Sequence, residues 1–146
     1  MENYLAELFV RDLTKLRDEV KKFKDDENIW RKEDGISNTA GTLVVHLVGS
    51  LNYTIGELVG HNGSVPDRVK EFTAIDVPKD ELVAAVEKLI AVVDQSLTGI
   101  TQQTLDAEYP LDAFGKRSTA FYLSHFYGHL NYHLGQVNYL RRILEG

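Results

Sequence analysis

Apolar residues recur at three- and four-residue spacing in the first part of the chain, from about Glu2 to Lys24. This period places them on one face of a helix and leaves the basic side chains between them for water. The sequence therefore predicts an amphipathic helix over about residues 2–24. Its apolar face contains Leu5, Leu8, Phe9, Leu13, Leu16, Val20 and Phe23.

The same periodicity predicts three further long helices. The second begins near Ser37 or Asn38, either of which can cap a first turn, and it stops at the glycine-containing cluster 60–63. The third begins at Pro78, which suits a first helical turn, and ends at Gly99. The last opens at Ser118 and runs to about residue 144. Apolar stripes run through Leu43, Leu47, Leu51, Ile55 and Leu58 in the second helix, through Leu82, Val83, Val86, Leu89, Ile90, Val93 and Leu97 in the third, and through Tyr122, Phe126, Val137 and Leu140 in the last.

The segments between these helices are predicted to be connections. Residues 24–38 are polar, and Trp30 within them is interpreted as a packing anchor. Residues 66–77 are predicted to form a loop, and residues 101–114 hold at most a short extended piece around Tyr109–Leu111. Four long amphipathic helices, with almost no strand signal and no repeat or linker, predict an all-α four-helix bundle that forms a single domain over residues 1–146.

The composition is that of an ordinary globular protein, and it excludes several classes of function. The chain has 146 residues, no cysteine and a formal net charge of −6. Without cysteine there is no disulfide, thiolate metal site or cysteine nucleophile, so any metal would be held by nitrogen or oxygen. The negative charge argues against a nucleic-acid partner. No apolar run reaches the ~20 residues of a membrane span and the acidic start is unlike a signal peptide, so we expect a cytoplasmic protein with no membrane partner.

Three of the five histidines fall close together on the last predicted helix: His125, His129 and His133. Steps of four residues keep them on one flank, but His125 and His133 lie about 12 Å apart along the axis, too far to share an ion. His129 and His133 have the i, i+4 spacing that lets two imidazoles bind one metal. Both lie in the middle of the apolar stripe, where a metal, hydrogen bonds or a wet cavity must satisfy them.

A third ligand would have to come from another helix. His46 lies on the border of the apolar arc of the second predicted helix, at a depth that suits the mouth of a pocket. His61 lies in a glycine-rich loop and is a weaker candidate. Three neutral imidazoles with an open coordination position are typical of a reactive metal site rather than a closed structural one. From these residues alone, a metal site and histidines satisfied without metal are equal alternatives.

Two motifs carry a resemblance to a known family. The run HFYGHLNYHLGQ at residues 125–136 resembles the last-helix signature of the DinB/YfiT-like superfamily, in which HxxxHxGQ recurs. The stretch GTLVVHLVGSLNY at residues 41–53 resembles the histidine motif of that family's second helix. The order and spacing of the helices agree as well, so the likeness extends over essentially the whole chain.

The resemblance implies a four-helix bundle, often a homodimer, that holds a divalent metal ion, Zn²⁺ or Ni²⁺, through His46, His129 and His133. Characterised members of this superfamily include transferases that depend on low-molecular-weight thiols and a mycothiol-dependent maleylpyruvate isomerase. The resemblance thus implies a small-molecule substrate and a low-molecular-weight thiol as partners.

Several further residues have candidate roles near the predicted triad or in packing. Arg68, Glu71 and Phe72 match an Arg…Glu-Phe element of the family, but we assign them no catalytic role. His125 is additional to the histidine triad, and its role is open. Gly135 is predicted to make a close helix–helix contact. Gln136 either orients a ligand histidine or a bound water, or makes an ordinary hydrogen bond at the surface. Tyr53, Tyr132 and Tyr139 are predicted to be core or dimer contacts.

The leading hypothesis is a metal-dependent enzyme in which the ion acts as a Lewis acid on a bound thiol or water. The reaction would be transfer of a low-molecular-weight thiol to an electrophile. The alternative is a non-catalytic, dimeric helix bundle that binds a metal for stability or binds another ligand. An open coordination position beside a pocket favours the enzyme, whereas a fourth protein ligand favours the alternative.

Overall fold

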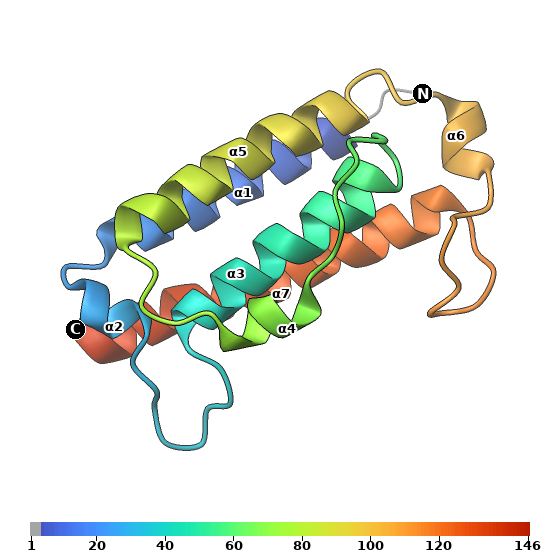
Figure 1. Ribbon diagram of the computed structural model, residues 1–146. Coiled ribbons are helices and arrows are strands. Elements are labelled where there is room, and N and C mark those ends of the chain that lie inside the picture. The colour runs from blue at the N-terminus through green and yellow to red at the C-terminus, as the bar shows by residue number, and fades with distance from the viewer. Residues whose placement is uncertain (1–3) are drawn as a thin grey trace.

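The computed structural model describes residues 4–146, which fold into helices without any strand in this range (Figure 1). The four long helices are α1 (Leu5–Lys22), α3 (Ala40–Leu51), α5 (Lys79–Leu97) and α7 (Thr119–Glu145). A π-helical segment, η1 (Asn52–Glu57), continues α3. Three short helices lie in the connections: α2 (Asp26–Ile29), α4 (Arg68–Thr73) and α6 (Gln102–Asp106).

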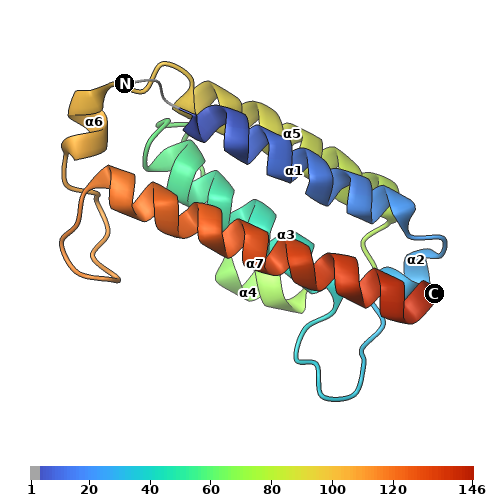
Figure 2. The ribbon, with the colours of Figure 1, turned by 180° about the vertical axis from the view of Figure 1, so that it is seen from behind.

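The long helices form the expected four-helix bundle. Helix α1 packs against α5 and α7, and α3 packs against the same two helices. Figures 1 and 2 show that α1 and α7 run in one direction, whereas α3 and α5 run in the other. Because α3 and α5 are parallel, the chain must return along the bundle between them. Residues 58–78 make this return, and α4 lies on it against α3.

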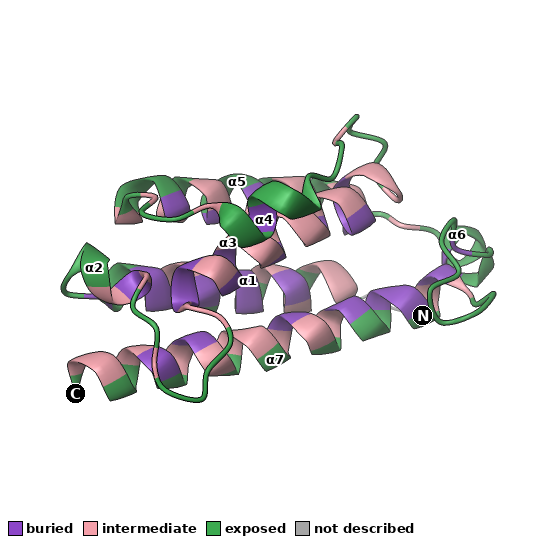
Figure 3. Cartoon of the chain, turned by 60° about the horizontal axis from the view of Figure 1, so that its bottom comes forward, coloured by how far each residue is buried: buried purple, intermediate pink, exposed green. Residues whose placement is uncertain are grey.

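The apolar stripes of the sequence are the faces that the bundle buries. Figure 3 shows buried positions repeating along α7, with exposed positions between them. Burial of such stripes is the main source of stability in a helix bundle, because short helices are marginal in water by themselves. Fully buried positions in the four long helices include Phe9, Leu13, Leu16, Leu47, Leu51, Val86, Val93, Leu97, Leu123, Leu130 and Val137.

Side chains at the helix starts explain where the helices begin. Ser118 caps α7 as predicted, because its hydroxyl oxygen accepts a hydrogen bond from the backbone N–H of Phe121 at 3.1 Å. The prediction for the second helix was wrong by one or two residues. Thr39 is the cap, and its hydroxyl oxygen accepts from the N–H of Thr42 at 3.1 Å. The π-helical segment η1 ends the second helix at Glu57, with Leu58 as its C-cap, shortly before the cluster 60–63 at which the helix was expected to stop.

The connections contain more structure than the sequence indicated. Residues 24–38 include α2, residues 66–77 include α4 instead of being only a loop, and residues 101–114 include α6. Helices of four to six residues are too short to show a 3.6-residue period, so the pattern could not reveal them. The extended piece at Tyr109 is present, because its backbone N–H donates to the carbonyl oxygen of Arg117 at 3.0 Å.

Trp30 is a packing anchor, as predicted. Its ring lies against Gly41, where an added Cβ would come within 2.7 Å of the indole carbons. Its indole N–H donates to the carbonyl oxygen of Val77 at 3.0 Å. Trp30 thereby ties the first connection to the start of α3 and to the segment that enters α5.

Among residues 4–146, none of the helices has both the length and the apolar character needed to cross a membrane.

Candidate metal centre

Three imidazoles meet between α3 and α7. His46 projects from α3, and His129 and His133 project from successive turns of α7. One ring nitrogen from each histidine can be chosen so that all three lie within 4.8 Å of one another. The rings of His129 and His133 have centroids 4.4 Å apart, and the His46 ring lies 5.2 Å from the first and 5.5 Å from the second. The packing of α3 on α7 therefore assembles the set predicted from the sequence.

The triad lies at the edge of the core, partly shielded from water. All three residues are half-buried, and the side chain of His46 is 14% exposed. Burial, together with the neighbouring rings of His133, His46 and His125, lowers the pKa of His129 to about 4. Burial likewise lowers the pKa of His46, although Glu71 acts in the opposite direction. The lowered pKa values of His46 and His129 favour their neutral form, which is the form that binds metals.

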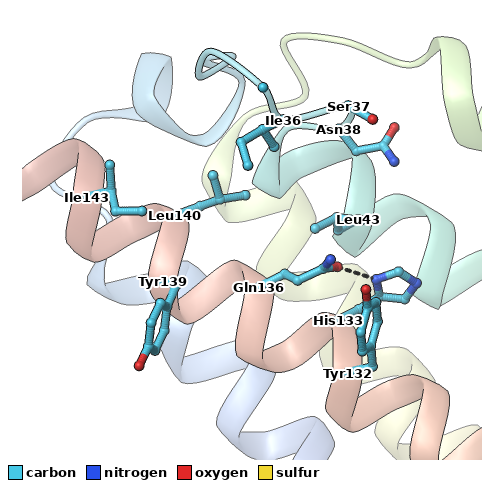
Figure 4. Close-up of a pocket in the computed structure, with 11 residues that line it drawn as sticks. Ile36, Ser37, Asn38, Leu43, Tyr132, His133, Gln136, Tyr139, Leu140 and Ile143 are labelled. Carbon is cyan, nitrogen blue, oxygen red and sulfur yellow. Dashed lines mark hydrogen bonds between the residues drawn. The ribbon is translucent and has the colours of Figure 1, made fainter.

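Two hydrogen bonds determine which ring nitrogens are free. Nδ1 of His133 lies 2.7 Å from Oε1 of Gln136, and Nδ1 of His46 lies 3.2 Å from Oε1 of Glu71. Each amide or carboxylate oxygen accepts, so each Nδ1 carries the proton and donates it. The lone pair is then on Nε2 in both rings. Of the two roles considered for Gln136, the one that orients His133 is the one observed (Figure 4).

The positions of the Nε2 atoms fit a bound cation. Nε2 of His129 and Nε2 of His133 are 2.9 Å apart. Since the His133 atom carries a lone pair, His129 must donate a proton across this gap when no metal is present. A metal ion would replace that proton and accept both lone pairs, because metal–nitrogen bonds of about 2.0–2.1 Å suit nitrogens at such separations. The donor set, with three neutral imidazoles, therefore fits a divalent transition metal.

The sequence matched Glu71 to a family element but gave no indication of its contact with His46, whose hydrogen-bond partner it is. Glu71 is the only buried residue of α4 and is 6% exposed, whereas the rest of this short helix faces solvent (Figure 3). It fits closely over Gly49 of α3, where an added Cβ would lie 2.8 Å from the carboxyl carbon. The sequence signal that could have indicated α4, the helix that bears Glu71, is its N-cap residue Asp67, whose side chain accepts a hydrogen bond from the N–H of Lys70.

Phe72, next to Glu71, also contacts the triad. Its ring centroid lies 5.0 Å from that of His46. The matched element Arg68, Glu71 and Phe72 thus belongs to the surroundings of His46, and the charge of Arg68 contributes to the lowered pKa of that histidine. Burying a carboxylate beside a ring N–H is a common way in which proteins fix the orientation of a ligand histidine.

The two remaining histidines lie outside the triad. His125 is exposed; its ring is parallel to that of His129 with centroids 6.4 Å apart, and it lies tilted against the ring of Phe114 with centroids 4.3 Å apart. His61 lies in the connection after η1 with a positive φ of 54°. In the described part of the chain, the group with metal-ligand geometry consists of His46, His129 and His133.

A groove opens beside His133. It has a volume of about 550 Å³ and lies between the C-terminal half of α7 and the loop that contains Ile36 (Figure 4). Both His133 and its partner Gln136 line it. Of the triad, His133 alone lines this groove, so a small molecule bound in it would lie against one side of the candidate metal centre.

Tyr132, Gly135 and Tyr139 lie on the exposed side of α7. Gly135 was interpreted as a close helix–helix contact, but this is wrong within the chain, because an added Cβ would meet nothing within 4 Å. Tyr132 and Tyr139 are 67% and 65% exposed, so neither is a core residue. Whether they make dimer contacts stays a prediction.

Comparison with known proteins agrees with the helical fold. No curated protein and no solved structure matches the chain. A family model described as the DinB superfamily matches residues 8–137, which include all four long helices in whole or in large part and all three histidines. The chain therefore belongs to the DinB superfamily.

Proposed function

We propose that this protein binds a divalent metal ion through His46, His129 and His133 and uses it for catalysis. One observation carries the proposal: two of the three imidazoles have their Nδ1–H groups engaged by Glu71 and Gln136, which leaves Nε2 free on the side where the rings converge. Hydrogen-bonded, neutral, half-buried imidazoles are pre-oriented ligands. Zn²⁺ and Ni²⁺ are the ions proposed, since both suit nitrogen donors.

We propose further that the reaction is transfer of a low-molecular-weight thiol to an electrophilic carbon. The ion would supply Lewis-acid activation of a thiol at its open coordination position. The histidines would hold the ion, and Glu71 and Gln136 would keep two of their rings in place. In the transfer, the thiol proton goes to solvent, a sulfur–carbon bond forms, and the leaving group departs with the electron pair of the bond that breaks.

Metal content tests the first part of this proposal. Elemental analysis of tag-free protein should find about one divalent ion per chain after incubation with Zn²⁺ or Ni²⁺ and dialysis. The double variant His129→Ala/His133→Ala should lose the ion and keep its helical circular dichroism. His61→Asn is the matched control, because it removes a histidine outside the triad and asparagine tolerates its positive φ. Metal retained by the double variant, or none bound by the folded wild type, would overturn the assignment.

An activity assay tests the second part. The metal-loaded protein is mixed with a low-molecular-weight thiol and monochlorobimane, whose chloride is the leaving group, and fluorescent product is followed. We expect a rate that depends on the metal and disappears in the double variant. A protein that binds metal but gives no metal-dependent rate across a panel of thiols and electrophiles would favour the alternative, a non-catalytic metal-binding bundle.

A homodimer completes the proposal. Phe121, at the start of α7 and outside the groove that Tyr132 and Tyr139 line, is 37% exposed in the single chain. Covering such side chains is a common reason for association. Sedimentation equilibrium should give twice the mass of one chain, and a monomer at all accessible concentrations would contradict the dimer.

A further inference from the structure

The groove beside the triad has a definite chemical character. One wall is α7 from Tyr132 to Ile143, and the other is the loop at Ile36, with Leu43 of α3 between them (Figure 4). Aromatic and branched aliphatic side chains make up most of this lining. Its volume of about 550 Å³ is that of a site for a small organic molecule.

The lining also lacks formal charge. None of the residues that line the groove is Asp, Glu, Lys or Arg. Arg142, next to Ile143 in the chain, lies 5.7 Å above the ring of Tyr139 and does not line the groove. An anionic ligand placed here would lose hydration without gaining a cation, which is costly. An uncharged apolar ligand would instead gain from the transfer of its surface out of water.

The polar groups are unevenly distributed. His133 and Gln136, joined by their 2.7 Å hydrogen bond, lie together on α7 at the triad, whereas Leu140 and Ile143 follow one and two turns further along the same helix. Ser37 and Asn38 are the polar side chains of the loop wall. A ligand that fills the groove would therefore have one end at the His133–Gln136 pair and the other among the apolar side chains of Leu140 and Ile143. This uneven distribution favours a small amphipathic molecule over a second copy of the chain.

We propose that the groove binds the uncharged, aromatic or branched aliphatic part of the substrate, and that it excludes the charged tail of a thiol. The inference rests on the proposed function in one respect only, namely that the reactive end of the bound substrate points toward the metal centre. In terms of substrate class, the groove would take the electrophile, and this electrophile would have an apolar body.

A matched pair of fluorescent probes tests the charge preference. N-phenylnaphthylamine is neutral, and anilinonaphthalene sulfonate has the same rings with one added negative charge. Titrated into metal-free protein at moderate salt, the neutral probe should bind with a Kd at least about tenfold lower than that of the sulfonate. Equal affinity, or tighter binding of the sulfonate, would overturn the proposal.

Variants locate the binding site. Ile36→Glu and Ile143→Glu place a carboxylate on opposite walls of the groove, and each should weaken the neutral probe about tenfold. Ile36→Lys should weaken the neutral probe and strengthen the sulfonate. Ile75→Glu is the control, since Ile75 is 71% exposed and does not line the groove. Loss of probe binding in the control but not in the groove variants would sink the assignment.

The outcomes separate this inference from the proposed function. Because the probes are titrated without metal, a failure of metal binding leaves the probe result unchanged, and groove variants that lose the probe should still bind the ion. Sedimentation of the same variants tests the other occupant. If Ile143→Glu turned a dimer into a monomer, the groove would be an interface between two chains and the ligand proposal would be wrong.

Discussion

Oε1 of Glu71 lies 3.2 Å from Nδ1 of His46, and the two residues come from different helices that are joined by the return segment of the bundle. The carboxylate fixes the ring proton of His46 on Nδ1 and leaves the lone pair on Nε2. It is therefore a positioning residue for the proposed metal centre, held in place by the close fit over Gly49.

Substitution at Glu71 should weaken metal binding without preventing folding. We expect Glu71→Gln to raise the Kd for Zn²⁺ by roughly tenfold, and Glu71→Ala by up to about a hundredfold, because the amide keeps an acceptor oxygen whereas alanine removes it. Competition with a chromophoric chelator measures both. Glu81→Gln, at an exposed position of α5, is the control. Unchanged affinity in both Glu71 variants would show that His46 needs no such partner.

Substitution at Gln136 should likewise weaken metal binding, because Gln136 orients His133 as Glu71 orients His46. The Gln136 amide oxygen is 2.7 Å from Nδ1 of His133, so Gln136→Leu, which keeps the size but removes the acceptor, should weaken Zn²⁺ binding roughly tenfold or more. Gln95→Leu on the exposed side of α5 serves for comparison. Because α7 is held by α1 and α3 along its length, we expect the unfolding temperature of both metal-free variants to stay close to that of the wild type. Equal Kd values for the two variants would contradict the assigned role.

The buried carboxylate of Asp12 should make stability depend on acid. Asp12 is 0% exposed; burial by itself would raise its pKa, but hydrogen bonds from Arg11, Tyr127 and Asn131 together outweigh this and hold the pKa well below its usual range. A lowered folded-state pKa stabilises the fold above the unfolded pKa of about 3.9, and the contribution is lost as pH falls toward the folded value.

The test is urea unfolding of Asp12→Asn, followed by circular dichroism. At pH 7 the variant should lose about 2–4 kcal/mol of unfolding free energy, because three donors lose a charged acceptor. Below about pH 4 the difference from the wild type should shrink. Asp18→Asn, whose side chain is 48% exposed and pairs with Arg17, should change stability by less than about 0.5 kcal/mol. A pH-independent difference for Asp12→Asn would argue against the lowered pKa.

Two glycine-to-alanine substitutions should have opposite effects. At Gly41 the new Cβ would lie 2.7 Å from the Trp30 ring, so we expect a loss of about 1–3 kcal/mol. At Gly135 the Cβ would meet nothing within 4 Å, so the higher helix propensity of alanine should stabilise the protein by up to about 1 kcal/mol. Thermal unfolding of the two variants and of the wild type measures both changes in stability. A destabilising Gly135→Ala would show that another chain covers this face of α7.

Much of the fold could be predicted from the sequence because its signals are local. An amphipathic helix of several turns repeats its apolar residues every 3.6 positions, so the stripes containing Leu13, Leu47, Val86 and Leu130 are visible without knowledge of their partners. The cap at Ser118 is equally local. The i, i+4 spacing of His129 and His133 already implies two rings on one face.

The tertiary structure alone decided what surrounds those rings. Glu71 lies in a helix of six residues whose single buried position is a charged one, so no apolar period could mark it. Its contact with His46 exists because parallel α3 and α5 require a return segment that passes over the site. The groove, likewise, forms only when the loop at Ile36 folds against α7. Periodicity encodes which face of a helix is buried, whereas contacts between distant segments depend on how the helices dock.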